Sequence, residues 1–179
     1  MTMTLTPATN RQLPDNSILD INGKQVYLGN QYTYALGGTE ITSTSEAPLL
    51  LLSNPAVTAS GFPSNYVSLF CNIRKMITLT DTENCILRFY LSPTVTGAGT
   101  PAAAVNRRGG SLNTTVGVIA TGATVSSNGS LVDMISSLSL ATDESNSLIV
   151  LDPGNDLLVT VQPSSTSTFI SAVIGWYQL

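Results

Sequence analysis

The sequence predicts an all-β fold, a two-sheet β-sandwich whose expected topology is a jelly roll of about eight antiparallel strands. Three observations carry this prediction. Short runs of alternating apolar and polar residues recur along the chain, clusters of Gly, Pro, Asn and Asp separate these runs, and no segment has the apolar spacing of a convincing helix. A shorter immunoglobulin-like sandwich with an added arm is the alternative topology.

The chain divides into an extended N-terminal arm over residues 1–22 and a sandwich domain over residues 23–179. The arm contains Pro7 and Pro14, several Thr and Asn residues, and only scattered apolar side chains. Such a segment has too few apolar side chains to form a core of its own. With 179 residues, the chain is long enough for a domain that folds without a disulfide or a metal.

The first strands of the sandwich are predicted from two different patterns. Tyr32, Tyr34 and Leu36 share one face of a strand that precedes a pair of glycines. Residues 49–52 are four consecutive leucines, and an Asn-Pro pair follows shortly after them. A continuous apolar run of this length predicts a strand that is buried on both faces.

The clearest alternation lies between Val67 and Leu91 and predicts a long β-hairpin with one dry face. The apolar residues of that face are Val67, Leu69, Cys71, Ile73, Ile77, Leu79, Cys85, Leu87, Phe89 and Leu91. A turn over residues 81–84 joins the two strands. Because Cys71 and Cys85 lie far apart along this hairpin, we expect two buried free thiols and no disulfide.

Further strands complete the predicted sandwich. They cover residues 116–120, 131–140, 148–151, 157–161 and 168–177. Within residues 131–140, Val132, Met134, Leu138 and Leu140 form the apolar side of the strand.

The composition favours a protein that packs against neighbours. Charged residues make up 10% of the chain and the net charge is −4. Ser, Thr and Asn replace charges on the surface, and hydroxyls and amides cost less to desolvate than charges do. The negative charge argues against nucleic-acid binding, and no apolar run is long enough to cross a membrane. The opening residues also lack the basic and then apolar pattern of a secretory signal.

Histidine is absent, which removes the commonest general base and the commonest metal ligand. The carboxylates of Glu40, Glu46 and Asp133 are scattered and suggest no acid–base pair. Asp152 and Asp156 are spaced as calcium ligands can be, but the sequence Asp-Pro-Gly-Asn is also what a tight turn requires, and we favour the turn. We therefore expect no catalytic residues, no cofactor, no metal site and no enzymatic activity.

The segment from Ala98 to Ser111 sets Arg107 and Arg108 beside two glycines and raises the main question about function. It has no phosphate-binding loop motif, and no aromatic residues are interleaved with the arginines as in a nucleic-acid site. Arginine is favoured at protein interfaces. We treat the segment from about Pro93 to Asn113 as a loop whose glycines make it costly to order unless a partner holds it. A solvated loop tip is the alternative.

Two stretches resemble small β-rich virion proteins of tailed bacteriophages. One is Gly99-Thr100-Pro101…Asn106-Arg107…Gly110-Ser111, and the other is Asp152-Pro153-Gly154…Leu157-Leu158-Val159-Thr160-Val161…Pro163, followed by an apolar strand that ends in Gly175-Trp176-Tyr177. The similarity covers residues 85–179. It implies a structural component that is made in the host bacterial cytoplasm and added to the particle, commonly as a homotrimer.

Capsid decoration (cement) proteins match best in size. An arm without a long shaft also favours them over a tail-tip domain, which would normally follow a shaft. The resemblance then implies a location on the capsid exterior and two partners, sister subunits and the major capsid protein, with no nucleic acid and no membrane. A receptor- or glycan-binding module of a tail tip or fibre is the alternative, for which Tyr66 and Phe62 are the candidate loop aromatics. The expected protein-contact residues are Arg107, Arg108 and Asn106 in the loop and Thr6, Pro7 and Arg11 in the arm.

Overall fold

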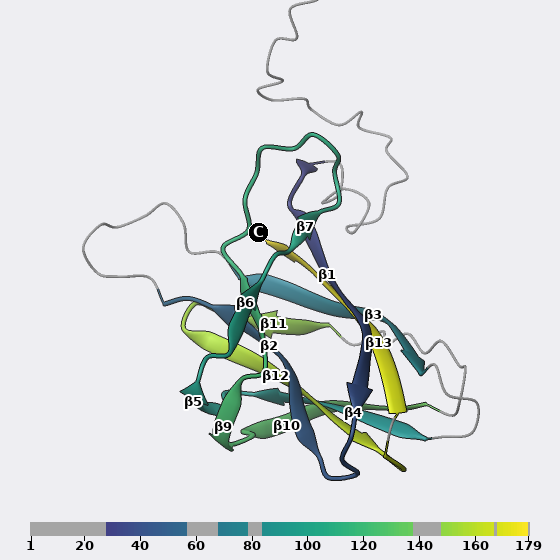
Figure 1. Ribbon diagram of the computed structural model, residues 1–179. Coiled ribbons are helices and arrows are strands. Elements are labelled where there is room, and N and C mark those ends of the chain that lie inside the picture. Colours follow the sequence, from purple (N-terminus) through teal and green to yellow (C-terminus); the bar gives the residue numbers. More distant parts are fainter. Residues whose placement is uncertain (1–27, 57–67, 79–83, 138–147, 167, 179) are drawn as a thin grey trace, which may run out of the picture.

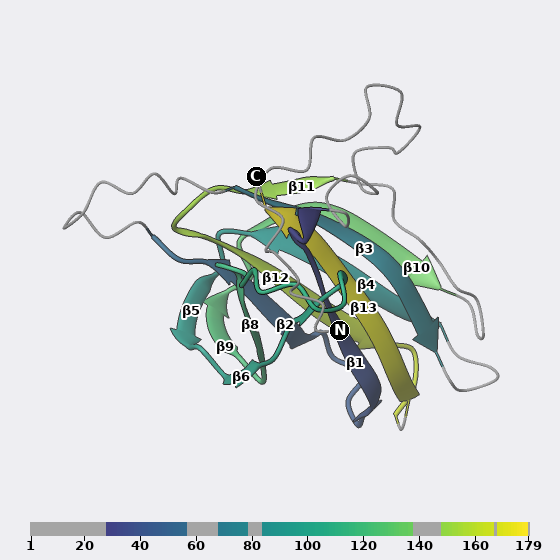
Figure 2. The ribbon, with the colours of Figure 1, turned by 90° about the horizontal axis from the view of Figure 1, so that it is seen from above.

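Two antiparallel sheets pack face to face, which confirms the all-β sandwich (Figure 1 and Figure 2). The computed structural model describes residues 28–56, 68–78, 84–137, 148–166 and 168–178, with residues 72–78 and 137 described by their backbone alone. The strands are β1 (Gln31–Ile41), β2 (Ala47–Asn54), β3 (Leu69–Thr78), β4 (Cys85–Leu91), β5 (Thr94–Gly97), β6 (Thr100–Ala102), β7 (Val105–Asn106), β8 (Val118–Thr121), β9 (Thr124–Ser127), β10 (Ser130–Ser137), β11 (Ile149–Leu151), β12 (Asn155–Pro163) and β13 (Thr168–Gln178).

The first sheet has the strand order β11-β3-β13-β1-β7, and the second has the order β10-β4-β12-β2-β8-β6. Strands β5 and β9 form a separate two-stranded ribbon. The described residues thus hold 13 strands, more than the eight or so expected from the sequence. The difference comes from β5, β6, β7 and β9, because the first three lie in the segment expected to be a loop and the fourth was not predicted.

The core lies between the two sheets. Its largest fully buried side chains include Trp176 of β13, Tyr32 of β1 and Phe89 of β4. The rings of Tyr32 and Trp176 are stacked with their centroids 6.2 Å apart. Aromatic pairs of this kind stabilise a core beyond the area that they bury. The core therefore joins β1 and β13 of one sheet to β4 of the other.

The second sheet is also covered on part of its outer face. Leu51 of β2 and Leu158 of β12 form a small cluster with Ala123, against which Val95 of β5 and Val125 of β9 pack. The β5–β9 ribbon thus explains why the four leucines of β2 are all buried, as the sequence predicted. A strand that is covered on both faces needs apolar residues at every position.

The predicted hairpin between Val67 and Leu91 is wrong in its pairing. β3 pairs with β11 and β13 in the first sheet, whereas β4 pairs with β10 and β12 in the second. Cys85, Leu87 and Phe89 do face the core. Alternation predicts which side chains face the core, but both sheets face the same core, so the pattern does not distinguish a hairpin from a crossover between sheets.

The predicted apolar side of residues 131–140 is also wrong. Ile135 is the buried residue of β10, while Val132 and Met134 are exposed. A register shift between Leu131 and Asp133 marks a β-bulge. One extra residue in a strand reverses the alternation that follows it, so the simple count pointed to the wrong face. The other two residues of that prediction, Leu138 and Leu140, lie outside the described residues.

β1 continues beyond the pair of glycines that was expected to follow its end. The strand runs to Ile41, with a register shift between Leu36 and Thr39 where it pairs with β13. Glycine inside a strand often marks such an irregularity. The predicted arm, residues 1–22, lies outside the described residues, as do residues 23–27 of the predicted domain.

Candidate functional site

The segment that follows Pro93 is attached to the rest of the protein by short strands. β6 pairs with β8, and β7 pairs with β1 through Tyr32 opposite Asn106 and Thr33 opposite Val105. The expectation that this segment is a loop without strands is wrong. The expectation that a partner must hold it is wrong as well, because its own chain does so (Figure 1).

Asn106 anchors the part of this segment that carries the two arginines. Its Nδ2 donates hydrogen bonds to the carbonyl oxygens of Gly29, at 2.9 Å, and Asn113, at 3.2 Å. Its Oδ1 accepts a hydrogen bond of 2.9 Å from the backbone N–H of Arg108. One amide side chain therefore fixes both ends of the turn from residue 106 to residue 113. We call residues 106–113 the loop tip.

Further hydrogen bonds fix the loop tip and the chain after it to the start of β1 and the end of β13. Asn113 donates from Nδ2 to the carbonyl oxygen of Leu28, at 3.2 Å, and to Oδ1 of Asn30, at 3.1 Å. Trp176 donates from Nε1 to Oγ1 of Thr115, at 2.9 Å. The buried indole N–H thus has a partner, and the chain that leaves the loop tip is tied directly to the core.

The loop tip presents two charged side chains and one apolar side chain to solvent. Arg107 and Arg108 are both exposed, and Leu112 is 95% exposed. The backbone N–H of Arg107 donates to the carbonyl oxygen of Gln31, at 2.9 Å, and its Nη1 donates to Oε1 of Gln31, at 3.5 Å. The arginines were expected at this site from the sequence, whereas Leu112 was not. The signal that could have identified Leu112 is an apolar residue inside a polar, Gly-rich turn.

Three of the six expected contact residues lie together in the loop tip, although Asn106 acts within the chain as an anchor. The other three, Thr6, Pro7 and Arg11, lie outside the described residues. The same holds for Tyr66 and Phe62, the candidate aromatics of a glycan-binding module.

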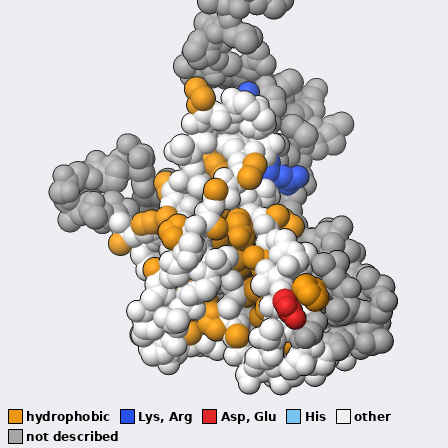
Figure 3. Space-filling model, viewed as in Figure 1, with side chains coloured by type: hydrophobic (Ala, Val, Ile, Leu, Met, Phe, Trp, Pro, Cys, Tyr) orange, Lys and Arg blue, Asp and Glu red, His pale blue; other side chains and the backbone are white. Residues whose placement is uncertain are grey.

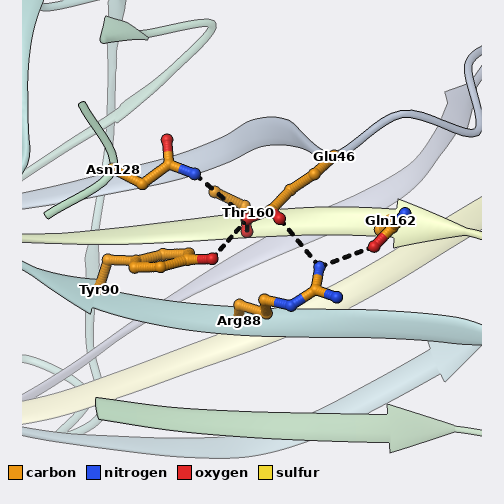
Figure 4. Close-up of polar contacts among 6 residues, drawn as sticks. All are labelled: Glu46, Arg88, Tyr90, Asn128, Thr160 and Gln162. Carbon is orange, nitrogen blue, oxygen red and sulfur yellow. Dashed lines mark hydrogen bonds and ion pairs between the residues drawn. The ribbon is translucent and has the colours of Figure 1, made fainter. Parts of the chain in front are cut away.

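A second polar group of residues lies on the outer face of the second sheet and centres on Glu46 (Figure 4). Oε1 of Glu46 accepts hydrogen bonds from Oγ1 of Thr160 at 2.6 Å and the hydroxyl of Tyr90 at 2.9 Å. It also accepts one from Nδ2 of Asn128 at 3.3 Å. Oε2 forms an ion pair of 3.0 Å with Nη1 of Arg88. The residues of this Glu46 network are Glu46, Arg88, Tyr90, Asn128, Thr160 and Gln162.

The Glu46 network joins neighbouring strands of the second sheet. Nη1 of Arg88 also donates to Oε1 of Gln162, at 2.8 Å, so the guanidinium links β4 to β12 as well as to Glu46. Burial raises the pKa of Tyr90, and the hydrogen bond from Tyr90 to Glu46 and the carboxylate charge raise it further. The network contains one carboxylate, surrounded by donors, and acid–base chemistry of the paired kind needs two. Local patterns in the sequence do not reveal this network, because the partners of Glu46 lie in β4, in β12 and between β9 and β10, far from residue 46 along the chain.

The two cysteines are free and buried, as predicted. Cys71 lies opposite Trp176 in the first sheet, and Cys85 lies opposite Pro163 in the second. The two residues do not share a hairpin, because they belong to different sheets. Burial raises the pKa of the Cys71 thiol to about 12 and that of the Cys85 thiol to about 11. Such thiols are protonated at neutral pH and therefore poor nucleophiles.

The sequence at Asp152 forms the predicted tight turn. The N–H of Asn155 donates to the carbonyl oxygen of Asp152 at 3.1 Å, and Gly154 has a φ of 85°. This is the conformation that Pro followed by Gly favours. Oδ1 of Asp152 accepts a hydrogen bond of 2.7 Å from Oγ of Ser68. Among the described residues, no group of three or more side chains is arranged to hold a metal ion.

Comparisons with known proteins assign no family. The sequence matches no family model and no curated protein. In the described part of the chain, there is also no helix that is long and apolar enough to cross a membrane. The loop tip is thus the candidate functional site on its own geometry, as an exposed group of charged and apolar side chains on a fixed backbone.

Proposed function

We propose that this protein is a structural component of a tailed-bacteriophage virion, one that decorates and stabilises the capsid shell by binding sister subunits and the major capsid protein. The loop tip is the observation that carries this proposal. Leu112 and the two arginines extend from a backbone that Asn106 and Asn113 already hold in place. A loop that is ordered before binding loses little conformational entropy when a partner binds it.

The surface beside the loop tip supports a role in assembly. Figure 3 shows a face with few charged side chains, on which apolar side chains gather over the region of β6 and β1. Tyr34, Leu36, Ala102 and Ala104 are partly buried apolar residues of these strands and of the chain next to β6, and they pack against the core. A face with few charges is cheap to desolvate, as a permanent contact in a particle requires.

The strand order supports the finer topology that the proposal expects. In the first sheet, β11, β3, β13 and β1 are neighbours, and in the second the corresponding neighbours are β10, β4, β12 and β2. Along the chain, β1, β2, β3 and β4 alternate between the sheets, and β10, β11, β12 and β13 alternate likewise. We infer a jelly roll from this connectivity, an architecture found in viral capsid domains and lectins.

The oligomer is expected to be a homotrimer made in the host cytoplasm and then bound to the outside of the shell. Sedimentation velocity of the purified full chain measures the first of these expectations. A single monomeric species at micromolar concentration contradicts the trimer, and it leaves capsid binding to be measured by itself.

The number of copies in purified particles tests the location. Quantitative mass spectrometry of the virions should find hundreds of copies for a shell protein. A few copies per particle favour the alternative, a receptor- or glycan-binding module of the tail. Absence from purified particles overturns both.

Variants of the loop tip test the contact itself. Replacing Arg107 and Arg108 together by Ala should weaken trimer formation or binding to particles that lack the protein, because a desolvated arginine at an interface contributes about 2 kcal/mol or more. Leu112→Ser should act in the same direction. Leu131→Ser is the matched control, because Leu131 is also an exposed apolar residue but lies in β10, outside the loop tip. If the loop-tip variants assemble and bind particles as the wild type does, the loop tip makes no contact with a partner and is only solvated.

A further inference from the structure

Three polar side chains lie next to one another at the base of the loop tip, on the outer face of the first sheet. Tyr32 and Trp176 face the core, so their chain neighbours Gln31 and Tyr177 point to the opposite face of the sheet. Gln31 of β1 lies directly opposite Tyr177 of β13. On the other side of β1, the backbone N–H of Arg107 donates to the carbonyl oxygen of Gln31. Gln31, Tyr177 and Arg107 are therefore neighbours across three segments of the chain.

Two of these side chains are buried although they lie on the outer face. Gln31 is 2% exposed and Tyr177 is 3% exposed. The ring of Tyr177 stacks with that of Phe70, with the centroids 4.9 Å apart, and burial alone raises the pKa of its hydroxyl. Among the described residues, neither the hydroxyl of Tyr177 nor Nε2 of Gln31 has a hydrogen-bond partner. Buried polar groups without a partner are costly, so two of them side by side indicate a binding site.

The contact with Arg107 fixes the orientation of the Gln31 amide. A guanidinium only donates hydrogen bonds, so Oε1 of Gln31 is the atom that faces Nη1 of Arg107, at 3.5 Å. Both N–H bonds of Nε2 are therefore left for another acceptor close to the guanidinium. The contact itself is at the long limit of a hydrogen bond and joins a full charge to a neutral oxygen. The guanidinium thus loses little when it turns to a charged acceptor.

The chemistry of the three groups defines the ligand. The amide of Gln31, the guanidinium of Arg107 and the hydroxyl of Tyr177 can all donate, so they suit a ligand that accepts hydrogen bonds. A carboxylate has two acceptor oxygens in the planar arrangement that a guanidinium binds bidentately. We propose that Gln31, Arg107 and Tyr177 form a carboxylate-binding site, and that its ligand is the side chain of an Asp or Glu on a protein partner.

The surroundings of the site favour a protein as the source of the carboxylate. Leu112 of the same loop tip is 95% exposed and offers an apolar contact beside the charge, as protein interfaces do. The inference deepens the proposed contact of the loop tip and rests on it for the nature of the partner. The site itself belongs to the single chain, so it is measured without a particle.

An NMR titration of the full chain with N-acetylglutamate amide tests the site, and N-acetylglutamine amide is the neutral control of the same shape. The side-chain NH₂ resonances of Gln31, identified by their loss in Gln31→Met, should shift saturably with the glutamate probe alone, with a Kd of about 1–10 mM. Arg107→Ala should weaken this binding by about tenfold or more, and Tyr177→Phe by about threefold. Tyr34→Phe, which removes a hydroxyl from the core side of β1, is the matched control and should bind as the wild type does.

Stability distinguishes a binding site from a structural role. Gln31→Met and Tyr177→Phe remove the two buried groups that lack a partner, so the midpoint of urea unfolding should stay the same or rise while probe binding falls. A lower midpoint in both variants would show that these groups are already satisfied within the fold, which overturns the site.

Failure of the site and failure of the proposed function give different results. If the glutamate probe leaves the Gln31 resonances unchanged, or if both probes shift them equally, the site is overturned, whatever the loop-tip variants do to assembly. If the probe binds but Gln31→Met assembles and binds particles as the wild type does, the protein partner is overturned. Glucuronate carries the same group on a sugar, and tenfold tighter binding of glucuronate than of the glutamate probe would assign the site to an acidic polysaccharide and overturn the protein partner as well.

Discussion

The Glu46 network and the loop tip use arginine in opposite ways. In the network, the side chain of Arg88 is 19% exposed and bonds Glu46 and Gln162 within its own sheet. In the loop tip, Arg107 and Arg108 are exposed, and Asn106 fixes the backbone that carries them. The difference lies in what the backbone around each arginine provides. Neighbouring strands offer Arg88 a carboxylate. In the loop tip, the guanidinium of Arg107 instead donates to the neutral amide oxygen of Gln31, at 3.5 Å.

This comparison indicates that the two regions serve different ends. An ion pair that is partly buried and joined to further hydrogen bonds contributes to folding stability, and removing one partner leaves the others unsatisfied. An exposed arginine contributes little to folding stability and keeps its binding capacity for another molecule. The network should therefore affect stability and not binding, and the loop tip should do the reverse.

Removal of the central carboxylate is the largest expected effect. Glu46→Ala removes the acceptor of the buried Thr160 hydroxyl and of the Tyr90 hydroxyl. It also breaks the ion pair with Arg88, which keeps its hydrogen bond to Gln162. We expect the free energy of unfolding to fall by about 2–3 kcal/mol, less than for a fully buried pair because Glu46 is partly exposed. Urea unfolding measures this. Glu40→Ala, the exposed control, should change it by less than about 0.5 kcal/mol, and an equal loss in both variants contradicts the role of the network.

A rise in pH should lower the folding stability through groups of the buried interior and not through the loop tip. The pKa of Cys71 is raised from 9.0 to about 12 and that of Cys85 from 9.0 to about 11. A raised pKa means that the folded state holds its proton more tightly than the unfolded state. Stability is therefore intact below pH 9 and falls as pH rises from there toward these folded-state values, by up to about 1.4 kcal/mol per pH unit for each thiol.

Urea unfolding at pH 7, 9 and 10 measures this loss. Cys71→Ala should make the alkaline decline shallower. Cys85 and Tyr90 also have raised pKa values and act in the same direction, so a residual slope is expected in that variant. Replacement of the loop-tip arginines should leave the slope unchanged. A stability that does not vary between pH 7 and 10 contradicts the burial of the thiols.

Loss of the loop-tip anchor should have an intermediate effect. Asn106→Ala removes hydrogen bonds to Gly29 and Asn113 and the acceptor for the Arg108 N–H. We expect a loss of about 1–2 kcal/mol in the free energy of unfolding, because backbone groups are left to water. Hydrogen exchange over residues 107–113 should become faster, and partner binding should weaken although both arginines are intact. Unchanged exchange in this segment would show that the loop tip is held by other bonds.

The smallest expected effect on stability belongs to the arginines themselves. Replacing Arg107 and Arg108 together by Ala should change the free energy of unfolding of the isolated subunit by less than about 0.5 kcal/mol, as is usual for exposed positions. The melting temperature should stay nearly constant while partner binding falls. A loss of stability comparable to that of Glu46→Ala would show that the loop-tip arginines stabilise the fold as the Glu46 network does.

The sequence predicted the parts of the fold that local patterns control. The alternation of Tyr32, Tyr34 and Leu36, the continuous leucines of β2 and the Asp-Pro-Gly-Asn turn all appear in the structure. These features depend on neighbouring residues along the chain. The errors arose where an extra residue sets the face of a strand, as at the bulge of β10, or where a distant strand sets the pairing, as for β3 and β4.

For the candidate site, composition alone was enough to show that Arg107 and Arg108 stand out in a chain with few charges and no histidine. Three features become visible only in the folded chain: the anchor that Asn106 provides, the exposed Leu112 in the same loop tip, and the contacts of Glu46 with Arg88, Tyr90 and Thr160. The physical reason is that composition and alternation are local properties of the chain. The hydrogen bond between Thr160 and Glu46, which are 114 positions apart, forms only once the strands have paired.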